Sequence, residues 1–108
     1  MPQQTVPRTV ALFAHAYALA GSPDDAMRLF GELEANAEET YIEPVAWAFA
    51  YLATRDREQA LRWIEMAGTS WTNNSLNIFY LKNNVFEDPL LEEADFVEAR
   101  QQLGYEEF

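Results

Sequence analysis

The sequence predicts an all-α fold, and three observations favour it. The chain resembles itself when it is shifted by 34 residues, and apolar residues recur at helical spacing within the resulting segments. Residues typical of helix ends stand at the borders of those segments. The identical pairs brought together by the shift are Ala14 with Ala48, Tyr17 with Tyr51, and Ala26 with Ala60. A repeat of this length is typical of helix pairs that stack into a solenoid.

Helix boundaries follow from the capping residues. Ser22 followed by Pro23 is typical of a helix start, with acids in the first turn. Asp56 and Gln59 have the spacing of a capping box. Glycines that stand where helices should end are Gly21 and Gly68. We expect helices at about 6–20, 23–37, 43–54, 57–68, 74–83 and 94–103, with a short turn near 88–92.

A chain of 108 residues, 49% of them hydrophobic, fits one globular domain. We expect a first repeat over about 7–40, a second over about 41–74, and a C-terminal capping segment over 75–108. The register of the repeat stops after the second unit. A stack of repeats needs an atypical end of this kind to cover its last hydrophobic face.

Charge and composition exclude several classes of function. The chain has 18 acidic against 7 basic side chains, a net charge of -11, which argues against nucleic acid and anionic membrane surfaces as partners. The longest apolar runs, 9–20 and 44–53, fall short of the roughly 20 residues that span a bilayer. There is no cysteine, which excludes disulfides and thiolate metal sites. We expect a cytoplasmic protein without a cofactor or a bound metal.

Two sets of residues resemble the tetratricopeptide repeat. The first-helix signature of large residue, small residue and tyrosine corresponds to Phe13, Ala14 and Tyr17, then Trp47, Ala48 and Tyr51. The second-helix signature corresponds to Ala26, Phe30 and Leu33, then Ala60, Ile64 and Ala67. The usual closing proline is replaced by Glu38 and Thr72. The resemblance implies an α-solenoid fragment of about two repeats with a helical cap at its C-terminus.

The C-terminal part resembles the closing segment of bacterial proteins that end in such repeats. The matching elements are Tyr80-Leu81-Lys82, Asp88-Pro89-Leu90, Phe96 and Leu103-Gly104. In those relatives the repeats often serve as the sensor or docking part of a longer regulator. The resemblance therefore implies a role in protein binding and gives no catalytic residues.

The repeat frame predicts a mostly apolar groove for a partner. Its lining residues are Arg8, Ala11, His15, Ala18 and Leu19 from the first unit and Val45, Phe49 and Leu52 from the second. We expect a non-catalytic module that binds a protein or peptide there, best as an apolar or amphipathic helix. Two other occupants stay open, namely the protein's own C-terminal helix and a second copy of the chain.

Other functions are weaker alternatives. One is a self-associating or sensor domain of a bacterial transcriptional or signalling regulator, with a homodimer as the working form. Another is a small metal-dependent hydrolase, which depends only on unassigned carboxylates. We expect no catalysis, because the four glycines form no phosphate loop and no motif gives a serine its base.

Three groups of residues admit either a structural or a functional interpretation. His15, the only histidine, could make a pH-sensitive ligand contact, but simple packing is favoured. The eight acids between Val85 and Phe108 are expected to form a solvated face, in which exposed pairs with nearby arginines contribute little. Those arginines are Arg55, Arg57 and Arg62. The aromatic residues expected in the core are Phe13, Phe30, Trp47, Trp63, Trp71 and Tyr80.

Overall fold

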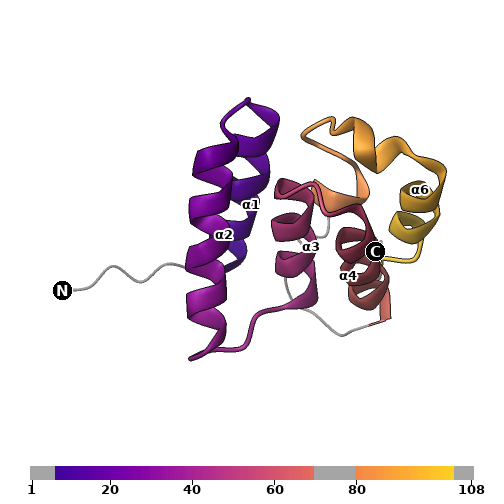
Figure 1. The fold of residues 1–108 in the computed structure, drawn as a ribbon. Coiled ribbons are helices and arrows are strands. Elements are labelled where there is room, and N and C mark those ends of the chain that lie inside the picture. The colour runs from indigo at the N-terminus through magenta and orange to yellow at the C-terminus, as the bar shows by residue number, and fades with distance from the viewer. Residues whose placement is uncertain (1–6, 70–79, 104–108) are drawn as a thin grey trace.

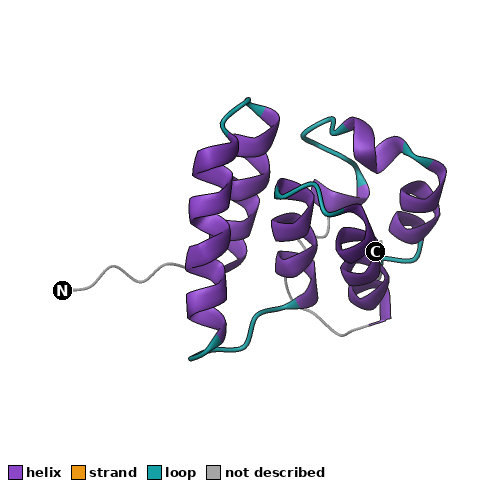
Figure 2. Cartoon of the chain, viewed as in Figure 1, coloured by secondary structure: helices purple, strands orange, loops and turns teal. Residues whose placement is uncertain are grey.

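Two helix hairpins lie side by side, and a C-terminal segment lies next to the second hairpin (Figure 1). The computed structural model describes residues 7–69 and 80–103, and all of these lie in helices, turns or loops (Figure 2). The hairpin helices are α1 (Pro7–Leu19), α2 (Pro23–Ala37), α3 (Pro44–Ala53) and α4 (Arg57–Thr69). A 3-10 turn, η1 (Pro89–Glu92), and helix α6 (Ala94–Gln101) follow. Residues 80–82 are also helical.

The predicted all-α class is confirmed for the residues that the structure describes. The bounds of the five helices that can be compared differ from the predicted ones by at most two residues, and the predicted turn near 88–92 is η1. Of the helix predicted at 74–83, residues 80–82 are helical. Residues 74–79 and Trp71 lie outside the described part of the chain.

Local sequence signals explain where the helices begin and end. Pro23 and Pro44 are the first residues of α2 and α3, a position where the missing N–H of proline costs nothing. The Asp56 carboxylate accepts a hydrogen bond from the Gln59 backbone N–H at 3.2 Å, as the capping pattern predicts. Gly21 follows α1 with a φ of 87°, a left-handed conformation that glycine adopts without strain.

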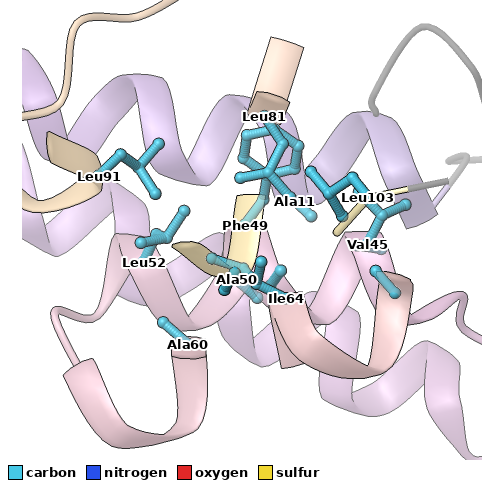
Figure 3. Close-up of a cluster of buried hydrophobic side chains, with 14 of the residues drawn as sticks. Ala11, Val45, Phe49, Ala50, Leu52, Ala60, Ile64, Leu81, Leu91 and Leu103 are labelled. Atoms are coloured by element: carbon cyan, nitrogen blue, oxygen red, sulfur yellow. The ribbon is translucent and has the colours of Figure 1, made fainter. Parts of the chain in front are cut away.

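Helix α3 is the centre of the molecule. Eight of its ten residues are buried, because α1 packs on one side of it and α4 on the other. Leu81, Leu91 and Leu103 belong to the same core cluster as Ala11 of α1 and Phe49 of α3, and Figure 3 shows Leu81 close to Ala11 and Phe49. The segment 80–103, called the C-terminal segment below, therefore completes the hydrophobic core.

Close packing of α4 against the C-terminal segment depends on Gly68, which the sequence placed at a helix end. Gly68 lies in the last turn of α4. A Cβ atom at this position would stand 2.9 Å from the backbone oxygen of Gln102, just after α6. The absence of a side chain thus permits the close approach of the two backbones.

Among the described residues, no helix combines the length and the apolar character that crossing a membrane requires.

Candidate functional site

Most of the predicted groove residues lie inside the molecule. Their positions are as follows: Ala11, His15, Val45, Phe49 and Leu52 are buried, Ala18 and Leu19 are half-buried, and Arg8 lies in α1 with its side chain outside the described residues. The buried apolar members pack in one core cluster with leucines of the C-terminal segment. In the described structure the C-terminal segment thus packs against these residues. Peptide binding there stays a prediction.

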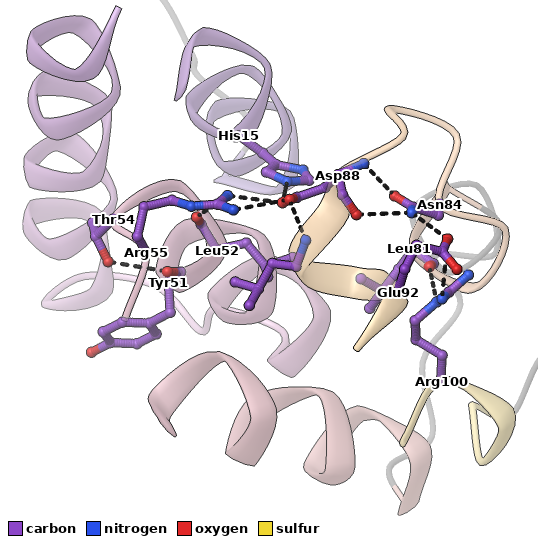
Figure 4. Close-up of polar contacts among 11 residues, drawn as sticks. His15, Tyr51, Leu52, Thr54, Arg55, Leu81, Asn84, Asp88, Glu92 and Arg100 are labelled. Atoms are coloured by element: carbon purple, nitrogen blue, oxygen red, sulfur yellow. Dashed lines mark hydrogen bonds and ion pairs between the residues drawn. The ribbon is translucent and has the colours of Figure 1, made fainter. Parts of the chain in front are cut away.

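A buried carboxylate, that of Asp88, connects the C-terminal segment to both hairpins (Figure 4). Its Oδ2 atom accepts hydrogen bonds from His15 Nε2 at 2.7 Å and from Arg55 Nη1 at 2.8 Å. Its Oδ1 atom accepts from Arg55 Nη2 at 2.9 Å and from the backbone N–H of Leu90 at 2.9 Å. The side chain of Asp88 is fully buried. Below, His15, Arg55, Asn84 and Asp88 are called the Asp88 cluster.

The members of the cluster come from three parts of the fold, since Asn84 and Asp88 share the loop before η1. His15 points inward from α1, between the rings of Phe49 and Phe86, whose centroids lie 5.4 and 5.5 Å away. Arg55 belongs to the turn between α3 and α4, and its Nη1 also donates to the backbone oxygen of Leu52 at 3.1 Å. Asp88 caps η1, which begins at the next residue. The cluster therefore fixes three elements relative to one another.

Asn84 holds the backbone of Asp88. Its Oδ1 accepts from the Asp88 N–H at 2.8 Å, and its Nδ2 donates to the Asp88 carbonyl oxygen at 3.0 Å. The same Nδ2 donates to Glu92 Oε2 at 2.7 Å. Within the described residues, the non-glycine residues with positive φ are Arg55, Asn84 and Glu87. All three belong to the cluster or adjoin it, so surrounding contacts must hold them in this unfavourable conformation.

The electrostatics favour an ionised Asp88. Burial alone would raise the pKa of this carboxyl group. Hydrogen bonds from His15, Arg55 and the Leu90 N–H outweigh that effect and lower its pKa well below the usual range. The hydrogen bond to Asp88 in turn raises the pKa of Arg55. Because an ionised carboxylate can only accept, the proton of the imidazole that faces it belongs to His15 Nε2.

The acidic C-terminal residues divide into two kinds. Arg57 pairs with the exposed Glu93 and Asp95 at 2.8 and 3.2 Å, as expected of a solvated acidic face. That expectation is wrong for Asp88, which is buried by the apolar residues around it. The sequence placed Asp88 at the start of the turn expected near 88–92 and Arg55 between the helices expected at 43–54 and 57–68. No spacing rule connects either of them to His15.

The cluster has a poor geometry for catalysis. An Asp–His pair serves acyl transfer when the other imidazole nitrogen faces a nucleophile. His15 Nδ1 is instead buried and has no hydrogen-bond partner in the described structure. Groups of three or more metal-ligating residues are also absent from residues 7–69 and 80–103. The arrangement can anchor a chain segment by charge-assisted hydrogen bonds.

A second candidate region is the outer face of α1, formed by Phe13, Ala16, Tyr17 and Ala20. Phe13 is 56% exposed and Tyr17 39% exposed, and the four residues line a surface hollow of about 290 Å³. The prediction that Phe13 belongs to the core is therefore wrong. No described helix covers this side of α1, so its aromatic side chains are exposed.

Comparisons of the chain with protein-family models, with curated proteins and with solved structures found no match. A function must therefore be inferred from the chain's own residues and contacts.

Proposed function

We propose that the protein is a non-catalytic interaction module of the tetratricopeptide type whose groove is closed by its own C-terminal segment. The observation that carries the proposal is the position of Asp88, held by Arg55 and His15 against the residues predicted to bind a partner. In this account the C-terminal segment occupies the place of a ligand. A partner segment of the same chemistry competes for that place.

The repeat assignment is supported by equivalent residues in the two hairpins. Ala14 and Ala48, which are 34 positions apart, are both fully buried where helices approach closely. The aromatic rings of Trp47 and Tyr51 on α3 pack against Phe30 of α2, with centroids 6.2 and 5.2 Å apart. Large residues thus fill the space between successive hairpins, while small ones permit close contact of the backbones.

The contacts of the C-terminal segment define what the groove selects. Asp88 supplies a carboxylate at the start of a helical turn, and Arg55 recognises it through two parallel hydrogen bonds. Phe86 stands two residues earlier against His15, and the buried Leu91 stands three residues later. A partner segment would therefore need an aspartate with an aromatic residue two positions before it and a leucine three positions after it.

A peptide with the sequence of residues 81–103 provides the test. A fluorescently labelled copy should bind the Asp88→Asn protein more tightly than the wild type, because the internal competitor is weakened. A second copy of the peptide, with asparagine in place of Asp88, should bind that same protein roughly tenfold to 100-fold less tightly, since hydrogen bonds to a charged group are lost. Fluorescence anisotropy measures both affinities.

The matched control is an Asp95→Asn protein, which loses an exposed pair with Arg57 and leaves the cluster intact. It should bind the peptide no better than the wild type does. Equal binding of the two peptides by the Asp88→Asn protein would contradict recognition of the aspartate. Circular dichroism of all proteins shows whether each variant keeps its helices.

A further inference from the structure

The apolar pattern on the outer face of α1 occurs again on α3, where a neighbouring helix covers it. The outer face of α1 corresponds, 34 positions later, to Trp47, Ala50 and Tyr51 of α3 and to Thr54, the residue after it. On α3 these residues are buried or half-buried, and the two aromatic rings pack against Phe30 of a neighbouring helix. On α1 the equivalent Phe13 and Tyr17 are exposed. The same sequence pattern is therefore packed against a neighbouring helix on α3 and exposed on α1.

The outer face of α1 carries no charged side chain of its own, although the chain is acidic. No Asp, Glu, Lys or Arg stands between Thr9 and Ala20, although the chain has a net charge of -11. Exposed parts of α2, α4 and α6 all carry carboxylates, among them Asp24, Glu65 and Glu98. An approach of two copies through α1 therefore avoids the like charges that an approach elsewhere brings together.

The sizes of the side chains on this face complement each other in an antiparallel pair. Positions 13, 16, 17 and 20 lie on one side of a helix, as large, small, large and small residues. When two copies of α1 run in opposite directions about a two-fold axis between positions 16 and 17, Phe13 faces Ala20 of the other copy. In the same register Tyr17 faces Ala16 of the other copy. A parallel pair would instead set large residues against large ones.

We propose that the occupant of this face is a second copy of the chain, joined through an antiparallel pair of α1 helices. The interface is isologous, because the same residues serve on both copies. It leaves the Asp88 cluster untouched, since His15 points from the opposite, buried side of α1. The inference does not depend on the proposed groove function.

Association is tested by sedimentation velocity from about 1 μM to about 1 mM, a range that covers weak dimers of small interface. The wild type should shift from monomer to dimer within this range. Phe13→Glu should raise the dissociation constant by roughly 30-fold or more, because each copy loses one of its two aromatic residues at the interface and gains a like charge.

Met27→Glu is the matched control, because Met27 is 52% exposed on α2 and does not line the hollow. It should leave the dissociation constant of the dimer within about threefold of the wild type, since a charge outside the interface acts only through screened repulsion. A wild type that stays monomeric throughout the range, or a dimer that Phe13→Glu leaves unchanged, overturns the proposal.

Introduced cysteines test the register, since the chain has none of its own. Position 16 lies beside the proposed two-fold axis, so an Ala16→Cys protein should form a disulfide-linked dimer under mild oxidation. Position 20 lies farther along the helix, and the two copies of it would be about 10 Å apart along the axis at 1.5 Å per residue. Ala20→Cys should therefore cross-link at least roughly tenfold more slowly. Equal rates, or faster cross-linking at position 20, overturn the antiparallel register.

Discussion

Helices α1 and α3 have equivalent sequences in the two hairpins, yet they occupy different environments. Eight of the ten residues of α3 are buried, and its aromatic pair Trp47 and Tyr51 packs against Phe30. Helix α1 is buried on its inner side only, where His15 contacts Asp88. Its own aromatic pair lies at the surface. The comparison teaches that an apolar pattern specifies a face to be covered, while the neighbouring elements decide whether it is covered.

The C-terminal segment adds to the hydrophobic core around α3 and α4. It joins α3 and α4 in the larger hydrophobic cluster through Leu81, Phe96 and Leu103. The contact between α1 and α2 has a smaller cluster of its own, which includes Val10 and Leu29. Stability should therefore be concentrated around α3 and the Asp88 cluster, and the outer face of α1 should contribute little to the monomer.

The largest expected effect comes from removing the buried carboxylate. Asp88→Ala should lower the free energy of unfolding by about 3 kcal/mol, because Arg55 and the buried His15 lose their shared acceptor. Chemical denaturation measures the change. Asp95→Ala, which removes an exposed acid paired with Arg57, should cost less than about 1 kcal/mol. Similar losses in the two variants would show that the cluster does not hold the fold.

Truncation of equivalent aromatic residues tests the comparison directly. Trp47→Ala should cost about 2–3 kcal/mol, below the full cost of a buried tryptophan because the ring is half-buried. Phe13→Ala should cost about 0.5 kcal/mol or less when the protein is dilute enough to be monomeric. Both values come from urea denaturation at the same low concentration. A large loss for Phe13→Ala under these conditions would mean that its face is already packed in the monomer.

Two glycines provide a smaller contrast of the same kind. Gly68→Ala should destabilise the protein by about 1–3 kcal/mol, because the new Cβ would meet the backbone oxygen of Gln102 at 2.9 Å. Gly31→Ala, in the exposed interior of α2, meets nothing within 4 Å and should stabilise it by about 0.5–1 kcal/mol. Thermal unfolding of the two variants gives the sign of each change. Equal signs would contradict the close approach of α4 and the residues after α6.

The contribution of Asp88 to the stability of the fold should change with pH only under acidic conditions. The pKa of Asp88 in the folded protein lies below the ordinary value of 3.8 for an aspartate, so the unfolded chain takes up the proton first. The stabilisation is fully present above that value and is lost as the pH falls below it. The difference in unfolding free energy between wild type and Asp88→Asn should be constant from about pH 7 to 5 and shrink below about pH 4. A constant difference down to about pH 2.5 would contradict the lowered pKa of Asp88.

Much of the fold could be predicted from local signals. Ser22-Pro23 and the Asp56–Gln59 pair are local signals of helix starts, and the structure confirms a helix start at both places. The candidate site could not be predicted in the same way. His15 was placed on the groove side of its helix, but its partner lies 73 positions away. Because the C-terminal region contains many acidic residues, the sequence did not distinguish the buried Asp88 from the exposed acids around it.

The sequence by itself determined the helices of the described residues and their boundaries to within two residues, because backbone hydrogen bonding, capping and apolar periodicity act over a few residues. Only the tertiary structure decided that Asp88 meets Arg55, 33 positions away, and that Trp47 is packed while Phe13 is exposed. Those outcomes depend on how whole elements pack. Burial changes the energy of a charge or a ring according to neighbours that are distant in the chain.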